Sequence, residues 1–512
     1  MTVFDQDVVI IGAGFSGLGA AIQLMQHGFD DLVVLDRGDD VGGTWRDNTY
    51  PGAACDVPSH VYSFSFAPNP NWSRSFSPQA EIHDYLRKTA LEWGVLPKLR
   101  LRRTVVDASW DPAALRWSVT TGDGETYRAR VLIAAAGPLS EPTIPDIPGL
   151  DRFPGTVFHS ATWDHDHDLA GRRVAVVGTG ASAIQFTPHV AREAAHTTVF
   201  QRTPAWIVPR ADRDLTAAEK WLFRNVPVTQ KLARSGDYWL RESYVLGFAL
   251  DTRLLEVAEK AALRHLKVQV SDPDLRARLT PDYRLGCKRV LISNDFYPAL
   301  MRDDVDLVAA GVTEVRGNTV IAADGTHSAP GAHRSQVDVD TIIFGTGFEV
   351  TRPPIAERIH DGDGRSLATA WEGGMRAYLG AQAVGYPNLF FLVGPNTGLG
   401  HNSIIFMAEA QIRYVVSAMQ QMVAAGVEAV DVRPEVEAAW DERVQQQLEG
   451  TVWTSGGCAS WYLDESGRNS TLWPRFTWQF RRRTASFDLD EQQVVVPTAR
   501  PVSARPAAAR AS

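Results

Sequence analysis

The sequence predicts an α/β protein in which one strand–turn–helix–strand unit occurs twice, with a helical insertion behind the second copy. The first unit spans residues 8–35 and has a glycine-rich turn at residues 12–17. The second unit spans residues 174–200 and has a similar turn at residues 178–183. A βαβ unit with such a first turn is typical of Rossmann-like dinucleotide-binding domains, so we expect two of them.

The two turns are the first candidate binding sites. Each lies between a strand and a helix, where glycines let the backbone approach a pyrophosphate and the helix N-terminus offers free N–H groups. The residues expected at the dinucleotides are Gly12, Gly14, Phe15 and Gly17 in the first turn and Gly178, Gly180 and Ser182 in the second. Ala183 replaces the third glycine of the second turn, and a small residue there still allows close helix–strand packing.

The charge that follows each unit distinguishes the two dinucleotides. Asp36 follows Gly17 by the same number of residues as Arg202 follows Ala183. A carboxylate at this position accepts hydrogen bonds from an unmodified ribose, which favours FAD in the first unit. A guanidinium pairs with a 2′-phosphate, which favours NADPH in the second, although Arg202 could also be an ordinary surface charge. We therefore expect one FAD domain and one NADP domain.

Composition excludes several classes of protein. The net charge of −9 argues against a nucleic-acid partner, because phosphate binding relies on clustered Lys and Arg. No apolar run reaches the roughly 18 residues of a membrane-spanning helix, and the N-terminus shows no secretory leader. The three cysteines, Cys55, Cys287 and Cys458, lie far apart and match neither a disulfide framework nor a zinc site. We expect a cytoplasmic protein without a membrane partner.

The chain is long enough for several domains, and the order of patterns predicts their limits. Strands at 131–136 and 341–344 are both expected to return to the sheet of the first unit. The predicted division is 1–140 and 341–485 for the FAD domain, 141–210 and 281–340 for the NADP domain, 211–280 for the helical insertion, and 486–512 for a disordered tail.

Three longer motifs narrow the class. They are the run from Gly42-Gly-Thr-Trp45 to Cys55-Asp56, the stretch 153–164 (FPGTVFHSATWD), and Phe344-Gly-Thr-Gly-Phe348. Together with the two turns, these motifs resemble the class B flavoprotein monooxygenases. The stretch 153–164 resembles the fingerprint of their Baeyer–Villiger branch. The segment after Trp461 is similar to that of the acetophenone-oxidising enzymes of this branch.

The resemblance implies a reaction. NADPH would reduce FAD, O2 would add to the flavin, and the resulting flavin peroxide would convert a ketone into an ester or lactone. The implied partners are therefore a small-molecule ketone and O2, while neither the particular ketone nor the oligomeric state can be deduced from the sequence.

The resemblance also implies roles for individual residues. Arg289 matches the active-site arginine and Asp56 the acidic residue that orients it. This pairing is physically reasonable, because a carboxylate partner limits the cost of burying a charge that an arginine never loses. The cofactor contacts that the resemblance adds are Trp45, Tyr62, Val105 and Asp56 for FAD, and Thr203, Lys288 and Trp461 for NADP.

Other functions stay open at this point. The same site could oxygenate sulfur or nitrogen, and a non-oxygenating FAD/NADPH reductase has the same two-domain build. A disulfide reductase would need a redox cysteine pair beside the flavin, and Cys55 has no such partner in the sequence. A non-catalytic NADP-binding sensor is a further alternative. The run Asp164-His-Asp-His-Asp168 is interpreted as a solvated loop, so we expect no metal.

Overall fold

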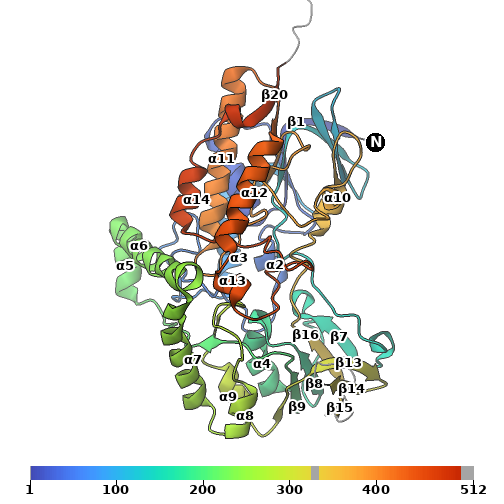
Figure 1. Cartoon of the computed structure of the whole chain (residues 1–512), viewed down its shortest axis with the longest axis vertical. Helices are drawn as coiled ribbons and strands as arrows, with labels where there is room; N and C mark the ends of the chain where they lie inside the picture. Colours follow the sequence, from blue (N-terminus) through green and yellow to red (C-terminus); the bar gives the residue numbers. More distant parts are fainter. Residues whose placement is uncertain (1, 324–333, 497–512) are drawn as a thin grey trace, which may run out of the picture.

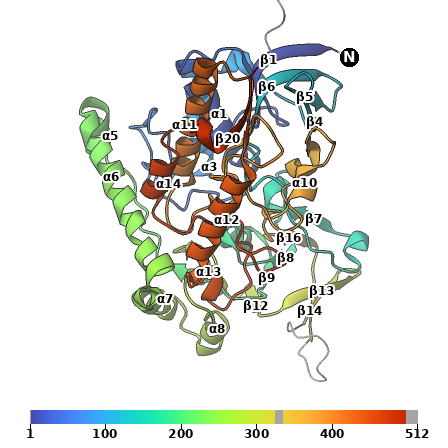
Figure 2. The same cartoon turned by 45° about the horizontal axis from the view of Figure 1, so that its top comes forward.

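The chain forms two lobes, each built on its own sheet, and the helical insertion lies along one side of both (Figures 1 and 2). The computed structural model describes residues 2–323 and 334–496. The helices of this part are α1 Phe15–Gln26, α2 Thr44–Asp47, α3 Gln79–Glu92, α4 Ala181–Glu193, α5 Ala217–Asn225, α6 Pro227–Ser243, α7 Leu255–Gln269, α8 Pro273–Arg278, α9 Phe296–Leu300, α10 Leu367–Ala370, α11 Ile404–Ala425, α12 Pro434–Leu448, α13 Val452–Ser455 and α14 Thr477–Arg483.

The first lobe contains an eight-stranded sheet in the order β17-β4-β5-β6-β1-β2-β3, with β18 paired to β6. Its strands are β1 Val3–Ile11, β2 Leu32–Leu35, β3 Leu99–Arg100, β4 Val105–Asp111, β5 Arg116–Thr121, β6 Thr126–Ala134, β17 Ile359–His360 and β18 Leu389–Phe391. Alternate residues of β1 serve two cores, because side chains along a strand point to opposite faces. Val8 and Ile10 pack with helices α1 and α11, whereas Val9 and Ile11 pack with the β4–β5 side.

The second lobe contains a five-stranded parallel sheet in the order β12-β9-β8-β16-β7. Its strands are β7 Thr156–His159, β8 Arg173–Val177, β9 His196–Phe200, β12 Val305–Val308 and β16 Thr341–Phe344. Val174 and Val176 of β8 pack with α4, and Ala175 packs with a three-stranded antiparallel sheet on the other face. The remaining strands are β10 Ile207–Val208, β11 Leu291–Ile292, β13 Gly311–Arg316, β14 Thr319–Ala323, β15 Arg334–Asp338, β19 Ala429–Val432 and β20 Gln492–Val495.

One predicted strand belongs to the other sheet. The strand at 131–136 lies in the first sheet as predicted, because β6 pairs with β1. The strand at 341–344 was predicted for the same sheet, and this was wrong: β16 pairs with β8 and β7 in the second. A four-residue apolar strand fits any buried parallel sheet, so its sequence cannot show which one it joins.

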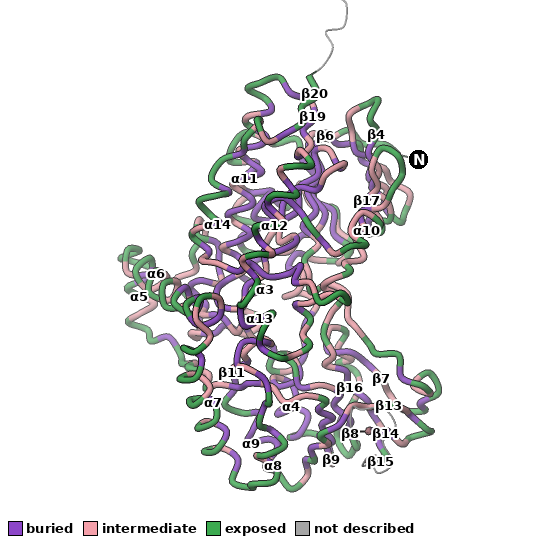
Figure 3. Tube along the Cα trace, viewed as in Figure 1, coloured by how far each residue is buried: buried purple, intermediate pink, exposed green. Residues whose placement is uncertain are grey.

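The predicted helical insertion is present as α5–α8 and is anchored by buried polar contacts. Helix α5 begins with a capping box in which Thr216 and Glu219 satisfy each other's backbone N–H groups. Glu242 of α6 is buried against the first lobe, where it accepts hydrogen bonds from Asn402 and Thr477. Much of α5–α7 nevertheless remains exposed (Figure 3).

No helix in residues 2–323 and 334–496 has both the length and the hydropathy to cross a membrane.

The C-terminal segment is more ordered than predicted. The expected disordered tail began at residue 486, but Gln492–Val495 forms β20 and pairs with β19. Phe487 is buried beside α11, where its N–H donates to the Ser417 hydroxyl. The segment is rich in polar residues, so its composition did not indicate that it forms a strand and buries Phe487. The rest of the predicted tail, 497–512, lies outside the described residues.

Candidate active site

The first glycine-rich turn has the geometry of a pyrophosphate cradle at the N-terminus of α1. A Cβ at Gly12, whose φ is +105°, would lie 2.5 Å from the carbonyl oxygen of Ala135. A Cβ at Gly17 would lie 1.8 Å from the carbonyl oxygen of Gly12. At Gly14 the nearest protein atom would be 3.8 Å away, at Gly43. Two glycines thus close the turn while Gly14 leaves space beside free N–H groups, which fits a dinucleotide phosphate.

Asp36 lies directly beside this turn. Its carboxylate accepts hydrogen bonds from the Ala13 N–H at 2.7 Å and from the Gly38 N–H at 2.7 Å. Arg46 adds an ion pair at 2.6 Å, and the Asp36 side chain is only 6% exposed. The predicted ribose-binding carboxylate is therefore fixed in place. Arg46 was not predicted, because its only sequence signal is its position next to Trp45.

The other residues predicted for FAD surround the same turn. The Trp45 indole N–H donates to the Tyr62 hydroxyl at 3.1 Å, and the ring of Phe15 meets Tyr62 edge-on at 5.4 Å between centroids. Burial raises the pKa of Tyr62 well above its ordinary range, so its hydroxyl keeps its proton. Val105 follows a segment whose Arg103 N–H donates to the Asp36 carbonyl. Phe15, Trp45 and Tyr62 therefore form one cluster at the first turn, and Val105 lies two residues beyond the contact with Asp36.

The second glycine-rich turn, between β8 and α4, has the same close backbone approach as the first. Gly178 has φ +106°, and a Cβ there would lie 2.6 Å from the carbonyl oxygen of Gly345. Gly180 has a free approach, since the nearest atom to its Cβ would be 3.7 Å away. Ala183 packs its methyl against Gly345, where any side chain would collide with it at 2.8 Å. Ser182 lies in the first turn of α4, which begins at this loop.

Two cations lie together near the second turn. The side chain of Arg202 packs against Gly311, and the Lys288 ammonium lies 5.2 Å from the centre of the Tyr283 ring. Burial and the nearby charge of Arg202 both lower the pKa of Lys288. Thr203 is placed in the same region by a 3.5 Å hydrogen bond from the Thr179 hydroxyl to its carbonyl. Two neighbouring cations fit a doubly charged 2′-phosphate.

Arg289 and Asp56 form the ion pair that the resemblance implied. The Arg289 Nε and Nη2 groups each donate to one Asp56 oxygen at 2.7 Å, a bidentate arrangement that fixes the guanidinium plane. The two side chains are 30% and 25% exposed. Burial alone would raise the pKa of Asp56, but the adjacent Arg289 charge holds it below its ordinary value. Both groups are therefore charged at neutral pH.

Two neighbours of this pair were not predicted. Tyr462 is fully buried, and burial raises its pKa to about 12 against the opposing influence of the nearby Arg289 charge. Arg241 of α6 donates a 3.5 Å hydrogen bond to the Asp56 carbonyl. Tyr462 could have been suspected because it follows Trp461, which is 45% exposed and whose ring centre lies 4.4 Å from that of Tyr462. No sequence motif surrounds Arg241, because it lies within an ordinary amphipathic helix of the insertion, so the sequence did not indicate its role.

The cysteine prediction requires a correction. No disulfide was expected, but the structure joins Cys287 to Cys458, 171 residues further along the chain. Sequence spacing could not indicate this pair, because the fold alone brings the Arg289 segment and the C-terminal segment together. Cys55 is a free, buried cysteine beside Asp56.

The histidine-rich run at 164–168 makes ordinary loop contacts. His165 bonds to the Thr49 hydroxyl at 2.7 Å, and His167 bonds to the Thr341 hydroxyl at 2.8 Å. The ring of Trp163 packs on Phe186 of α4. This run therefore connects the fingerprint stretch to both lobes.

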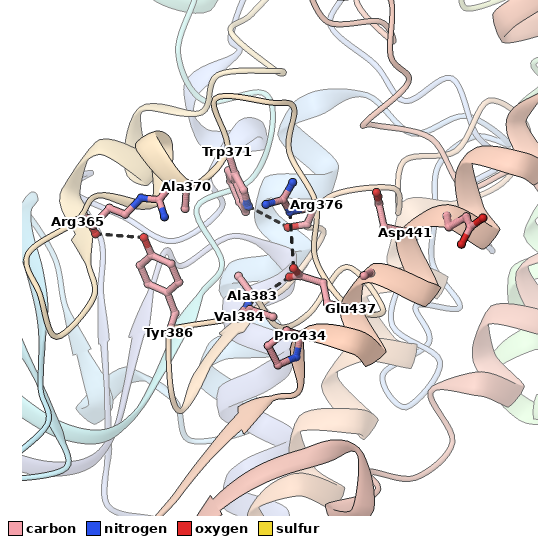
Figure 4. Close-up of a pocket in the computed structure, with 12 residues that line it drawn as sticks. Arg365, Ala370, Trp371, Arg376, Ala383, Val384, Tyr386, Pro434, Glu437 and Asp441 are labelled. Atoms are coloured by element: carbon pink, nitrogen blue, oxygen red, sulfur yellow. Dashed lines mark hydrogen bonds and ion pairs between the residues drawn. The ribbon is translucent and has the colours of Figure 1, made fainter.

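A cavity of about 510 Å³ lies away from all of these residues, between α10 and α12 (Figure 4). Trp371, Arg376 and Tyr386 line one side, and Glu437 faces them. Burial raises the pKa of Glu437 to about 7, although its carboxylate accepts a hydrogen bond from the Val384 N–H. None of the predicted cofactor residues borders this cavity, so it is not the predicted site.

The chain is similar to known flavoprotein monooxygenases in both sequence and structure. The sequence model of one family, flavin-binding monooxygenase-like, matches residues 5–366. A Baeyer–Villiger monooxygenase of Streptomyces coelicolor is 52% identical over 503 residues, covering 98% of this chain and 95% of that protein. A Baeyer–Villiger monooxygenase of Pseudomonas aeruginosa is 45% identical over 482 residues, covering 94% and 90%. The crystal structure of OTEMO in complex with FAD and NADP superposes with a TM-score of 0.84 at 27% identity, covering 96% and 99%.

Proposed function

The chain belongs to the flavin-binding monooxygenase-like family and is an FAD-containing, NADPH- and O2-dependent Baeyer–Villiger monooxygenase, and we propose that its Arg289–Asp56 pair is where oxygen reaches a ketone. The observation that carries this proposal is the bidentate ion pair between the two predicted catalytic side chains. The pair lies where a segment of the first lobe meets a segment that follows the helical insertion.

The cofactor contacts follow from the two turns. FAD held at the first turn and reduced by NADPH would supply the activation of O2, and one oxygen atom of O2 would be inserted beside the carbonyl carbon. The first turn would hold the FAD pyrophosphate on the N–H groups of α1, and the Asp36 carboxylate would accept hydrogen bonds from the hydroxyl groups of the adenosine ribose. The second turn binds NADPH, and Arg202 and Lys288 pair with its 2′-phosphate.

In this proposal Arg289 stabilises the negative charge that develops during oxygen transfer. When oxygen adds to a ketone, negative charge develops on the carbonyl oxygen, and a fixed cation lowers the barrier most when it needs no reorganisation. The bidentate contact with Asp56 provides this preorganisation, and the lowered pKa of Asp56 keeps the carboxylate ionised at neutral pH. In this proposal Arg289 is catalytic and Asp56 positions it.

The setting of the reaction completes the proposal. The substrate is a small-molecule ketone, and the enzyme works in the cytoplasm, where NADPH is regenerated. No metal ion or nucleic acid takes part.

Product analysis tests this function directly. The holoenzyme is incubated with NADPH, O2 and a panel of cyclic, linear and aryl ketones plus one sulfide, and products are identified by mass spectrometry. We expect esters or lactones whose added oxygen comes from ¹⁸O2. Sulfoxide without any ester would show that the site oxygenates heteroatoms instead, and NADPH oxidation without an oxygenated product would contradict the proposal.

A further inference from the structure

The Cys287–Cys458 disulfide connects two segments that both carry proposed site residues. Cys287 lies two positions before Arg289, and Cys458 lies three positions before Trp461. The bond therefore ties the segment of the catalytic arginine to the C-terminal segment that is expected at the nicotinamide. No other covalent link joins these parts of the described chain.

The contacts around the bond show that the two segments are closely fitted. The Arg284 N–H donates to the Gly456 carbonyl at 3.1 Å. A side chain at Gly456 would collide with the Cβ of Cys287 at 2.6 Å, so the backbones approach as closely as glycine permits. Cys287 is only 1% exposed, whereas Cys458 is partly exposed and accessible to a small reductant.

The C-terminal segment has little else to hold it beside Arg289. Within residues 2–323 and 334–496, no hydrogen bond is donated by a backbone N–H between residues 457 and 461. The next anchors are the buried ring of Tyr462 and the Thr471 hydroxyl, which donates to the Tyr462 carbonyl at 3.0 Å. Residues 457–461 thus lie between two anchored ends, with the Arg284–Gly456 hydrogen bond and the disulfide at one end and Tyr462 at the other.

We propose that the Cys287–Cys458 disulfide is a positioning element for oxygen transfer, which holds residues 457–461 against the Arg289 segment and keeps water out of the site. The inference rests on the proposed roles of Arg289 and Trp461. Exchange with a dithiol such as dithiothreitol would break the S–S bond, which gains two electrons and two protons, while the dithiol closes into its own disulfide. Residues 457–461 would then loosen, and water exclusion, on which productive oxygen transfer depends, would weaken.

The state of the cysteines is tested first. Holoenzyme purified in air without reductant is unfolded and titrated for thiols, with and without prior reduction. We expect one reactive thiol per chain, Cys55, without reduction and three after it. Peptide mapping should recover a linked Cys287–Cys458 peptide from the unreduced sample. Three thiols without reduction would overturn the inference.

The effect on catalysis is tested by the ratio of H2O2 to ester formed per NADPH consumed. Dithiothreitol should raise this ratio several-fold in the parent enzyme, while the rate of anaerobic flavin reduction changes little. Cys458→Ser should show the raised ratio from the start and no response to dithiothreitol, which makes it the matched control for side effects of the reductant. Cys458 is chosen because its partial exposure makes the substitution tolerable for folding.

Hydrogen exchange supplies a readout that does not depend on turnover. Reduction should accelerate exchange at Arg284, whose N–H donates to the Gly456 carbonyl, and at Tyr462 and Leu463, whose N–H groups donate to Ser460, and it should leave residues 12–17 unchanged. If ester forms but neither exchange nor the H2O2 ratio responds to reduction, the inference fails and the proposed function stands. If no ester forms in any redox state while exchange at Arg284, Tyr462 and Leu463 still responds, the proposed function fails and the disulfide remains a structural clamp only.

Discussion

The two glycine-rich turns use the same backbone device but distribute their small residues differently. Gly12 and Gly178 have nearly equal φ values, +105° and +106°. A Cβ at Gly12 would lie 2.5 Å from the Ala135 carbonyl oxygen, and a Cβ at Gly178 would lie 2.6 Å from that of Gly345. In the first turn the helix position is Gly17 and the strand residue is Ala135. In the second the order is reversed, with Ala183 on the helix and Gly345 after the strand. The first turn therefore requires glycine on the helix, where a methyl would collide with the Gly12 carbonyl, whereas the second turn accepts Ala183 because Gly345 leaves room for its methyl.

The charges beside the two turns are also built differently. Asp36 is buried and held by neighbours from its own lobe, at the end of the strand that follows the turn. Arg202 instead has Lys288 as a charged neighbour, which lies far away in the sequence beyond the helical insertion. The proposed FAD site is thus largely local, whereas the proposed phosphate site of NADP depends on a distant segment. Substitutions at the two turns and at Arg289 test this contrast.

Gly17→Ala is expected to have the broadest effect, because it should disturb the fold of the turn and abolish FAD binding together. Its methyl would lie 1.8 Å from the Gly12 carbonyl oxygen, so the turn itself would have to move. Overpacking of this kind costs about 1–3 kcal/mol, and we expect the purified protein to be colourless. The matched change Ala183→Gly only removes a methyl and should leave both cofactors bound. Flavin absorbance per chain and thermal unfolding measure the outcome, and a yellow Gly17→Ala protein of parental stability would refute the contrast.

Gly14→Ala separates fold from ligand in the same turn. Its methyl would meet no protein atom closer than 3.8 Å, so the chain should fold with parental stability. The methyl would nevertheless point into the space assigned to the pyrophosphate and should weaken FAD binding. Titration of the apoprotein with FAD gives the binding constant. Unchanged affinity would show that the pyrophosphate lies elsewhere.

Arg289→Ala tests the point where the two lobes meet. Loss of one preorganised charge of this kind costs about 2.7–4 kcal/mol in the barrier, or roughly two to three powers of ten in rate. FAD should stay bound and flavin reduction should persist, because neither turn is altered. Arg289→Lys keeps a positive charge but not the bidentate contact, so its rate of ester formation should lie between those of the parent and of Arg289→Ala. Stopped-flow measurement of flavin reduction and ester yield would separate these effects, and near-parental ester formation by Arg289→Ala would remove its catalytic assignment.

Arg202→Ala should affect the second site alone. Removing a charge-assisted contact costs about 1.5–3 kcal/mol, which corresponds to a roughly ten- to hundred-fold rise in the NADPH dissociation constant. NADH, which lacks the 2′-phosphate, should bind as before and is the internal control. Binding measured by fluorescence would decide the matter, since an unaltered preference for NADPH would assign the phosphate to other residues.

What the sequence could predict follows the same local-versus-distant division. Asp36, Gly17 and Arg202 lie at fixed distances from a glycine turn, and a local pattern suffices to find them. The Cys287–Cys458 bond, Arg241 and the sheet that receives β16 depend on segments that only the folded chain brings together. Arg289 and Asp56 are also far apart in the sequence. Only the resemblance to the class B flavoprotein monooxygenases, through their long motifs, indicated that the two residues form a pair. Physical spacing rules therefore predicted the turns, but not the junction between the lobes.

The smallest predicted effect concerns pH. Burial and Arg202 lower the pKa of Lys288, so this amine loses its proton at a lower pH than an ordinary lysine. Below its lowered pKa the charged ammonium attracts the 2′-phosphate, and this attraction is lost as the pH rises through that value. NADPH binding should therefore weaken in the alkaline range before an ordinary lysine would titrate, while the phosphate's own ionisation, near about 6, is already complete. Lys288→Arg should abolish this decline because a guanidinium stays charged. Dissociation constants measured across the alkaline range for NADPH and, as a control, NADH would show it, and an identical pH profile for parent and variant would exclude Lys288 from the phosphate site.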